Sequence, residues 1–190
     1  MVKVPIFQDS ILISSVNNKE LDETIVKILQ NEMQDNKGNF FSNMGGYQTK
    51  NIQNNIICDT LLQESAGLIV ENYKLAKVKI IMKNLWINQN NKNDFNTPHI
   101  HQLSNFSGVY YVEVSDTNGE LIFFRADKSN QMLEIQSFIK DKDFYEEHHI
   151  KPLKNQLIIF PSHLVHMVKP HFEEKPRISV SFNITIERHG

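Results

Sequence analysis

Hydrophobic positions in the first part of the chain follow the spacing of amphipathic helices. Residues 20–34 and 58–76 each carry an apolar stripe that recurs about every 3.6 residues, so both are predicted as helices that cover a sheet. The stripes consist of Leu21, Ile25, Ile28 and Leu29, and of Leu61, Leu62, Ala66, Ile69, Val70 and Tyr73. Residues 4–16 are typical of an opening strand, and the stretch 35–55, with its glycines and asparagines, of an irregular loop.

From residue 78 the pattern changes to short runs rich in Val, Ile, Phe and Tyr, bounded by Gly, Pro, Asn or Asp. Such runs predict strands at 78–88, 107–114, 119–126, 132–139, 155–160 and 177–187. Many short strands in one domain indicate a sandwich or a closed barrel. We therefore predict one domain, 1–190, that is mainly β with flanking helices. An N-terminal strand and supporting helices (1–77) would buttress a jelly-roll core (78–190).

Composition narrows the classes of function. The chain has 190 residues, 40% of them hydrophobic, and a net charge of −2, which gives no electrostatic case for binding nucleic acid or a membrane surface. No apolar stretch approaches the roughly 18–20 residues of a membrane span, and the first residues lack the pattern of a signal peptide. The single cysteine, Cys58, cannot form an internal disulfide. These features predict a cytoplasmic protein, of a bacterium or of an infected host cell. The many asparagines, as in 90–96, we attribute to an AT-rich genome rather than to chemistry.

Three histidines form the main candidate site. His99 and His101 are two positions apart ahead of a β-rich segment, so on a strand both would point to the same face. His166 follows on another predicted strand and could close a metal site with open positions. This is the geometry of a redox iron centre rather than of a structural zinc. A lone histidine is more often a surface or core residue, but the three together predict a metal-dependent oxygenase.

The other histidines carry weaker signals. His148 and His149 lie in a charged stretch and predict a solvated sheet edge, whereas His163 could line the mouth of the site. His171 and His189 give no signal. Trp86 could line the pocket, but we favour an ordinary core position for it.

Arg177 and Ser179 alternate with apolar residues along the last predicted strand, so one face is polar and the other apolar. A guanidinium offers a planar fork of donors for a carboxylate, and a hydroxyl adds another donor. An arginine beside a metal inside a barrel therefore indicates an anionic co-substrate. The alternative is that Arg177 is an ordinary surface arginine on an edge strand.

In order along the chain, these residues resemble the 2-oxoglutarate and Fe(II)-dependent oxygenases of the double-stranded β-helix (cupin-like) fold, and within them the prolyl-hydroxylase-like group. The resemblance covers about residues 80–187. A bacterial and phage subfamily of such oxygenases is closer still, and the pattern shared with it includes Trp86, Asn88, His99, His101 and the run SGVYY (107–111). The wider group matches at Phe160, His166, Val168, Pro170 and Arg177. The resemblance implies Fe(II) bound by His99, His101 and His166. It also implies 2-oxoglutarate bound by Arg177, Ser179, Tyr111 and Asn88.

One position departs from the usual pattern. Most members of the group have Asp or Glu where this chain has His101, so three neutral imidazoles would leave the site one unit more positive. A register with His101 as the first ligand would place Leu103 at the carboxylate position, and leucine cannot bind a metal. A carboxylate from elsewhere, such as Asp94 or Asp127, remains an alternative ligand.

We therefore predict an Fe(II)- and 2-oxoglutarate-dependent dioxygenase that hydroxylates a small molecule or peptide, with no catalytic residues beyond the metal ligands. One rival is a three-histidine cupin-type dioxygenase that does not use 2-oxoglutarate, which Arg177 and Ser179 argue against. Another is a non-catalytic barrel that acts as a binding module. We expect the substrate to be recognised by loops 89–98, 125–131 and 140–150. Exposed edge strands are compatible with a homodimer.

Overall fold

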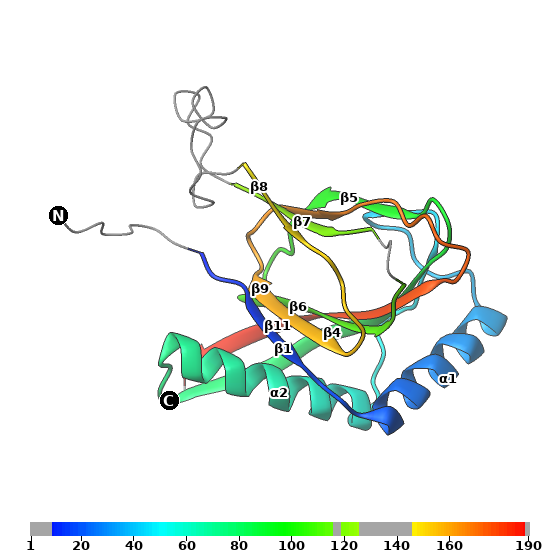
Figure 1. The fold of residues 1–190 in the computed structure, drawn as a ribbon. Helices are drawn as coiled ribbons and strands as arrows, with labels where there is room; N and C mark the ends of the chain where they lie inside the picture. Colours follow the sequence, from blue (N-terminus) through cyan, green and yellow to red (C-terminus); the bar gives the residue numbers. More distant parts are fainter. Residues whose placement is uncertain (1–8, 116–118, 126–145, 189–190) are drawn as a thin grey trace.

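The computed structural model of the protein describes residues 9–115, 119–125 and 146–188. Within these ranges the chain forms two helices and two antiparallel sheets that face each other (Figure 1). The larger sheet consists, in spatial order, of β1 (Leu12–Ser15), β9 (Gln156–Pro161), β6 (Phe106–Glu113), β11 (Arg177–Arg188), β4 (Val78–Asn90) and β3 (Tyr47–Gln48). The smaller sheet consists of β2 (Asn43–Met44), β5 (Phe95–His99), β10 (His166–Val168), β7 (Leu121–Phe124) and β8 (Glu147–Ile150). The helices are α1 (Lys19–Asp35) and α2 (Asn55–Tyr73).

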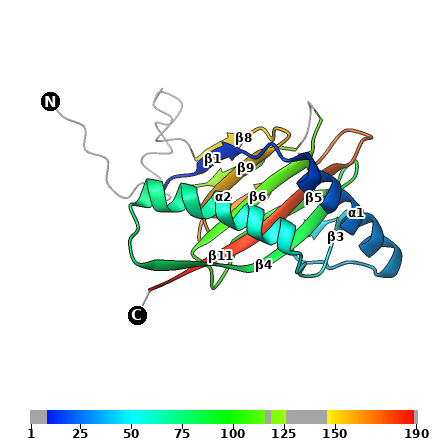
Figure 2. The same cartoon turned by 90° about the horizontal axis from the view of Figure 1, so that it is seen from below.

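Both helices begin at an asparagine cap. The side-chain oxygen of Asn18 accepts from the backbone N–H of Leu21, and that of Asn54 accepts from Ile57, which satisfies donors that a helix start leaves open. The cap at Asn54 is the reason that α2 begins three residues before the predicted start. Both helices lie on the outer face of the larger sheet, and Figure 2 shows α2 crossing it diagonally. The predicted stripe of α2 was wrong at Val70 and Tyr73, whose side chains are exposed.

The apolar residues form two clusters, one on each face of the larger sheet. The outer cluster joins the sheet to both helices and includes Ile25 of α1, Ile57 of α2 and Phe182 of β11. The inner cluster, with Phe123 and Phe160, lies between the two sheets. Because alternate side chains of a strand point to opposite faces, β11 sends Phe182 toward the helices while its odd-numbered residues face the smaller sheet.

The predicted architecture, mainly β in a jelly roll with supporting helices, is confirmed. Three stretches predicted as loops contain short strands, and one of them, residues 140–150, contains β8. Residues 35–55 contain the short strands β2 and β3, and residues 89–98 contain most of β5; these strands are too short to leave an alternating pattern. The strand predicted at 132–139 lies outside the described residues. Neither described helix is long and apolar enough to cross a membrane.

Candidate active site

Three imidazoles converge between the sheets. His99 ends β5 and is the direct cross-strand partner of His166, the first residue of β10. The ring centroids of His99 and His166 are 4.3 Å apart, and that of His101 is 5.1 Å from each of them. One ligand nitrogen from each ring lies within 4.8 Å of the others, and no other group of this kind occurs among the described residues. The structure thus brings together the three histidines selected from the sequence.

His101 reaches this position differently from the prediction. The strand ends at His99, so His101 does not share its face by strand alternation. Its backbone N–H instead donates to the carbonyl of Ser162, 3.0 Å away, and this bond fixes the turn next to β9. The indole of Trp86 stacks on the His101 ring at 5.7 Å with an interplanar angle of 23°. Trp86 therefore lines the site, and the prediction of an ordinary core position was wrong.

Backbone carbonyls orient two of the three rings. Nδ1 of His99 lies 2.7 Å from the Thr97 carbonyl oxygen, and Nδ1 of His166 lies 2.9 Å from that of Leu164. A carbonyl can only accept, so each Nδ1 carries the proton and donates it. In the neutral ring Nε2 then keeps its lone pair. Histidine ligands of metals are commonly held in this way.

The three rings favour the neutral form. Burial lowers the pKa of His166 to about 3 and that of His101 to about 4, and the neighbouring imidazoles add to both shifts. Burial also lowers the pKa of His99. Desolvation disfavours the charged imidazolium, and neutral imidazole is the form that binds a metal. The three rings can therefore bind a cation near neutral pH without first releasing protons.

A cavity of about 700 Å³ extends from the histidines between the sheets. The inward-facing residues of β4 and β11 form its floor in pairs that the strand register sets: Asn90 with Arg177, Asn88 with Ser179, Trp86 with Ser181, and Asn84 with Asn183. On the other side of β11, Tyr111 of β6 lies opposite Ser179. Arg177, Ser179, Tyr111 and Asn88, all selected from the sequence, thus lie in one cavity with the histidines.

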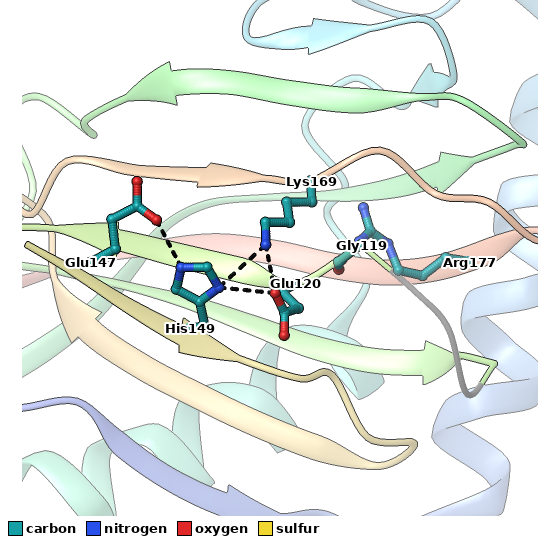
Figure 3. Close-up of polar contacts among 6 residues, drawn as sticks. All are labelled: Gly119, Glu120, Glu147, His149, Lys169 and Arg177. Atoms are coloured by element: carbon teal, nitrogen blue, oxygen red, sulfur yellow. Dashed lines mark hydrogen bonds and ion pairs between the residues drawn. The ribbon is translucent and has the colours of Figure 1, made fainter.

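Arg177 is buried at one end of this cavity. Its Nη1 donates to the Gly119 carbonyl at 3.0 Å, and its Nη2 donates to Asn90 Oδ1 at 2.8 Å. Figure 3 shows the guanidinium beside Gly119. Its Nε is buried without a hydrogen-bond partner, and no carboxylate of the described residues forms an ion pair with it. Burial lowers the pKa of Arg177, yet arginine keeps its charge in proteins. The charge of Asp94 acts on Arg177 without a hydrogen bond between them, so the buried guanidinium can still take a carboxylate ligand.

Tyr111 is the second buried group beside Arg177. Its side chain is 2% exposed, and burial raises the pKa of its hydroxyl to about 12 although the charge of Arg177 opposes the shift. The hydroxyl is therefore protonated and can donate. Its neighbour Tyr110 points the other way, where its hydroxyl donates to Asp22 of α1 at 2.7 Å. The alternation of β6 thus separates a structural tyrosine from a cavity tyrosine.

The remaining histidines lie elsewhere. His163 pairs with Asp9 at 3.3 Å on the surface, so the expectation that it lines the mouth of the site was wrong. His148 and His149 are exposed on the edge strand β8, as predicted. His149 contacts Glu120 and Glu147 at 2.9 and 2.8 Å, beside Lys169 (Figure 3). His171 is buried away from the metal cluster, where its Nε2 donates to the Lys175 carbonyl. His189 lies outside the described residues.

Asp94, one of the two alternative carboxylate ligands, does not lie at the cluster. Asp94 accepts from the backbone N–H of Asn91 at 2.6 Å and packs against the turn at Gly45 and Gly46, outside the cavity lining. Asp127 lies outside the described residues. Among the described residues the imidazole set is complete without a carboxylate. The donor set suits a divalent iron, which imidazole binds well, and leaves coordination positions for further ligands.

Sequence reasoning missed most of the polar lining. Seven asparagines border the cavity: Asn39, Asn51, Asn84, Asn88, Asn90, Asn96 and Asn183. Attributing the asparagines to genome composition alone was therefore wrong. A signal was present, because Asn84, Trp86, Asn88 and Asn90 alternate along one face of β4 and match the polar face of β11.

Comparisons with known proteins agree with this geometry. The sequence model of the family described as "Putative 2OG-Fe(II) oxygenase" matches residues 84–183, more than half of the chain. No curated protein sequence matches the chain.

Solved structures share the fold. A prolyl-4-hydroxylase from Pseudomonas putida aligns with a TM-score of 0.60 and 16% identity over 96% of this chain and 94% of its own. The viral collagen prolyl hydroxylase of Paramecium Bursaria Chlorella virus-1 gives 0.57 and 12% over 92% and 94%. The alpha-ketoglutarate-dependent epimerase SnoN gives 0.69 and 9% over 96% and 82%. At such identities the likeness shows the fold, a double-stranded β-helix.

Proposed function

The chain belongs to the 2OG-Fe(II) oxygenase family, and we propose from this premise that His99, His101 and His166 hold the iron. The protein is an Fe(II)- and 2-oxoglutarate-dependent oxygenase. With 2-oxoglutarate and O₂, the metal supplies oxidation of a substrate C–H bond to C–OH, and 2-oxoglutarate leaves as succinate and CO₂. One observation carries the assignment of residues: three neutral imidazoles and an unpaired buried arginine share one cavity.

Arg177 is proposed to bind the distal carboxylate of 2-oxoglutarate. Its Nε lacks a partner, and the guanidinium already has a fixed orientation through Gly119 and Asn90. Ser179 and Tyr111 lie next to it in the strand register and can add hydroxyl donors. Asn88, the partner of Ser179 on β4, completes this part of the lining. A charge-assisted, preorganised set of donors favours a carboxylate over a neutral group.

The three-histidine set is electrostatically compatible with this co-substrate. Neutral ligands leave the full charge of Fe(II) in the site, and the dianion of 2-oxoglutarate can compensate it. Water is limited on one side by Phe160, whose ring lies 4.7 Å from that of His166 and 4.9 Å from that of Phe123. These residues bind, orient and shield the reactants, while the oxidation belongs to the metal.

Anaerobic titration of the metal-free protein with Fe(II) and then 2-oxoglutarate tests this proposal. We expect the visible metal-to-ligand charge-transfer band of an iron-bound 2-oxo acid, and its loss in His166→Ala. His148→Ala, at the exposed sheet edge, is the matched control and should retain the band. Iron binding without the band would instead favour a three-histidine dioxygenase that binds its substrate directly. Failure to bind iron would contradict the metal site altogether.

We also propose that the protein works in the cytoplasm of a bacterium or of an infected host cell. The single cysteine, Cys58, is unpaired, and Fe(II) persists in a reducing compartment. Fractionation of cells that express the tagged protein tests this. Recovery in a secreted or periplasmic fraction would contradict it.

A further inference from the structure

The cavity floor continues past the histidines, away from Arg177. Asn183 follows Arg177 by six positions on β11, which corresponds to roughly 20 Å along an antiparallel strand. Between them Ser181 pairs with Trp86, whose indole stacks on His101. The metal cluster therefore lies near the middle of the floor. A co-substrate anchored at Arg177 and bound to the metal does not extend to the row that contains Asn183.

A directed hydrogen-bond chain fixes this far row. Ser107 Oγ donates to Asn183 Oδ1 at 2.8 Å, and Asn183 Nδ2 donates to Asn84 Oδ1 at 2.8 Å. Because the single proton of Ser107 is used in this way, Ser162 must be the donor in its 2.8 Å contact with Ser107 Oγ. This series of hydrogen bonds uses the side-chain carbonyl of Asn84 as an acceptor. The amide N–H groups of Asn84 have no described partner, and Asn84 lines the cavity.

The residues next to the histidine cluster on β4 and β11 have complementary hydrogen-bonding groups that remain free. Asn88 Nδ2 donates to Ser181 Oγ at 3.0 Å. Asn88 Oδ1 thus keeps acceptor capacity, and the Ser181 hydroxyl keeps its proton for donation. Fixed donors at Asn84 and Ser181 and a fixed acceptor at Asn88 therefore surround the indole of Trp86. A hydroxyl group, which both donates and accepts, matches such an alternating set.

The charges of the residues that line the cavity exclude charged groups from the part of the cavity near Asn84. No Asp, Glu or Lys of the described residues lines the cavity, and Arg177 is the one lining residue there with a permanent charge. An ammonium group near Asn84 would have no anion to pair with, and a second carboxylate or a phosphate would have no second cation. Burial of an unpaired charge is strongly unfavourable, whereas a neutral polar group needs only hydrogen bonds.

We propose that Asn84, Asn183 and Ser181 form the subsite for the prime substrate, with Asn88 at its border with the 2-oxoglutarate site, and that this substrate is an uncharged polyhydroxylated molecule, a sugar or polyol, with one ring face against Trp86. This inference rests on the proposed function, because it assigns the Arg177 end of the cavity to 2-oxoglutarate. Apolar rings and fixed amides together orient such a ligand, and unpaired amides penalise analogues that lack the hydroxyls.

The only tryptophan of the chain, Trp86, provides a direct probe. Protein loaded anaerobically with Fe(II) and 2-oxoglutarate is titrated with methyl glucoside and inositol, with their charged counterparts glucosamine and glucuronate, and with a capped neutral peptide. We expect saturable changes in fluorescence with the neutral hydroxylated probes only. Asn84→Ala should weaken this binding by about tenfold or more, since it removes fixed donors. Asn72→Ala, on the exposed face of α2, should leave it unchanged.

A second variant tests the charge argument independently. Asn84→Asp introduces an anion into the far row and should shift preference toward glucosamine. Equal binding of charged and neutral probes by the unmodified protein, a response to the peptide alone, or no response to any hydroxylated probe would each overturn the proposal. The charge-transfer band separates the two hypotheses: a protein that forms the band but ignores the hydroxylated probes refutes the subsite alone, whereas failure to form the band refutes the proposed function.

Discussion

The Nε2 atoms of His101 and His166 lie 3.2 Å apart, with the two rings stacked at 5.1 Å and only 6° from parallel. Nδ1 of His166 donates its proton to the Leu164 carbonyl, so Nε2 of His166 accepts and Nε2 of His101 donates. A metal ion held by both rings would take the place of this hydrogen bond, and the neutral His101 ring would then carry its proton on Nδ1. The pair is thus held together before the metal arrives.

Removal of His101 should therefore abolish tight iron binding. His101→Ala leaves two imidazoles, and we expect the Fe(II) affinity to fall by about 100-fold or more, beyond the usual effect of losing a residue that only supports a ligand. Anaerobic calorimetry measures it. His148→Ala, which removes an exposed imidazole on β8, should bind iron as the unmodified protein does. Equal affinity in His101→Ala would place the third ligand elsewhere.

A carboxylate at position 90 should compete with 2-oxoglutarate. Asn90 Oδ1 already accepts from Arg177 at 2.8 Å, so Asn90→Asp supplies a permanent anion to the unpaired guanidinium. We expect the 2-oxoglutarate affinity to fall by about tenfold or more while the Fe(II) affinity stays the same, because charge-assisted pairs are the stronger ones. Titration of the charge-transfer band measures both. Asn72→Asp makes the same chemical change on the surface of α2 and should alter neither; an unchanged 2-oxoglutarate affinity in Asn90→Asp would contradict the assigned role of Arg177.

The metal-free protein should lose stability as the pH falls. The pKa of His166 is lowered to about 3 in the folded protein, so below the ordinary imidazole value of 6.5 the unfolded chain binds the proton first. The contribution is complete above 6.5 and is lost progressively toward the folded value. Between about pH 7.5 and pH 5 this amounts to about 2 kcal/mol for His166. Urea unfolding measures it, and His166→Gln should lose a smaller amount; an identical loss in the variant would refute the assignment.

Two glycines should respond oppositely to alanine. A Cβ at Gly67, on α2, meets nothing within 4 Å, so Gly67→Ala should stabilise the protein by up to about 1 kcal/mol through helix propensity. A Cβ at Gly108, on β6, would lie 2.3 Å from the ring of Phe182 and 2.8 Å from Ile159, so Gly108→Ala should destabilise by about 1–3 kcal/mol. Thermal unfolding compares them. Stabilisation by both substitutions would show that the larger sheet packs more loosely against its helices than described.

The three histidines and the main strands could be predicted from the sequence for a physical reason. Alternation along residues 177–183 separates the polar cavity face of β11 from its apolar helix face, and the structure has the same division. The strands β9 and β11, which come before and after His166 in the sequence, are long enough to show their period. An arginine and three histidines indicate an iron and carboxylate site by their residue types and spacing. This site could therefore be predicted although the exact bounds of the strands could not.

What could not be predicted depends on three-dimensional pairing. Trp86 was expected in the core, because an aromatic residue on a strand fits either face until the partner strand is known. The turn that carries His101 depends on a bond to Ser162, which is distant in sequence. The alternation of asparagines along β4 is visible in the sequence, but their pairing with the polar face of β11 depends on the register of the two strands.

Anomalous diffraction at the iron edge, from crystals grown anaerobically with Fe(II) and 2-oxoglutarate, tests the three-histidine iron centre directly. We expect one iron bound by Nε2 of His99, His101 and His166 at about 2.0–2.2 Å, a typical metal–imidazole distance. The distal carboxylate of 2-oxoglutarate should lie on Arg177. An iron held by two of the histidines and a carboxylate, from Asp94 or from Asp127, would contradict the three-histidine centre.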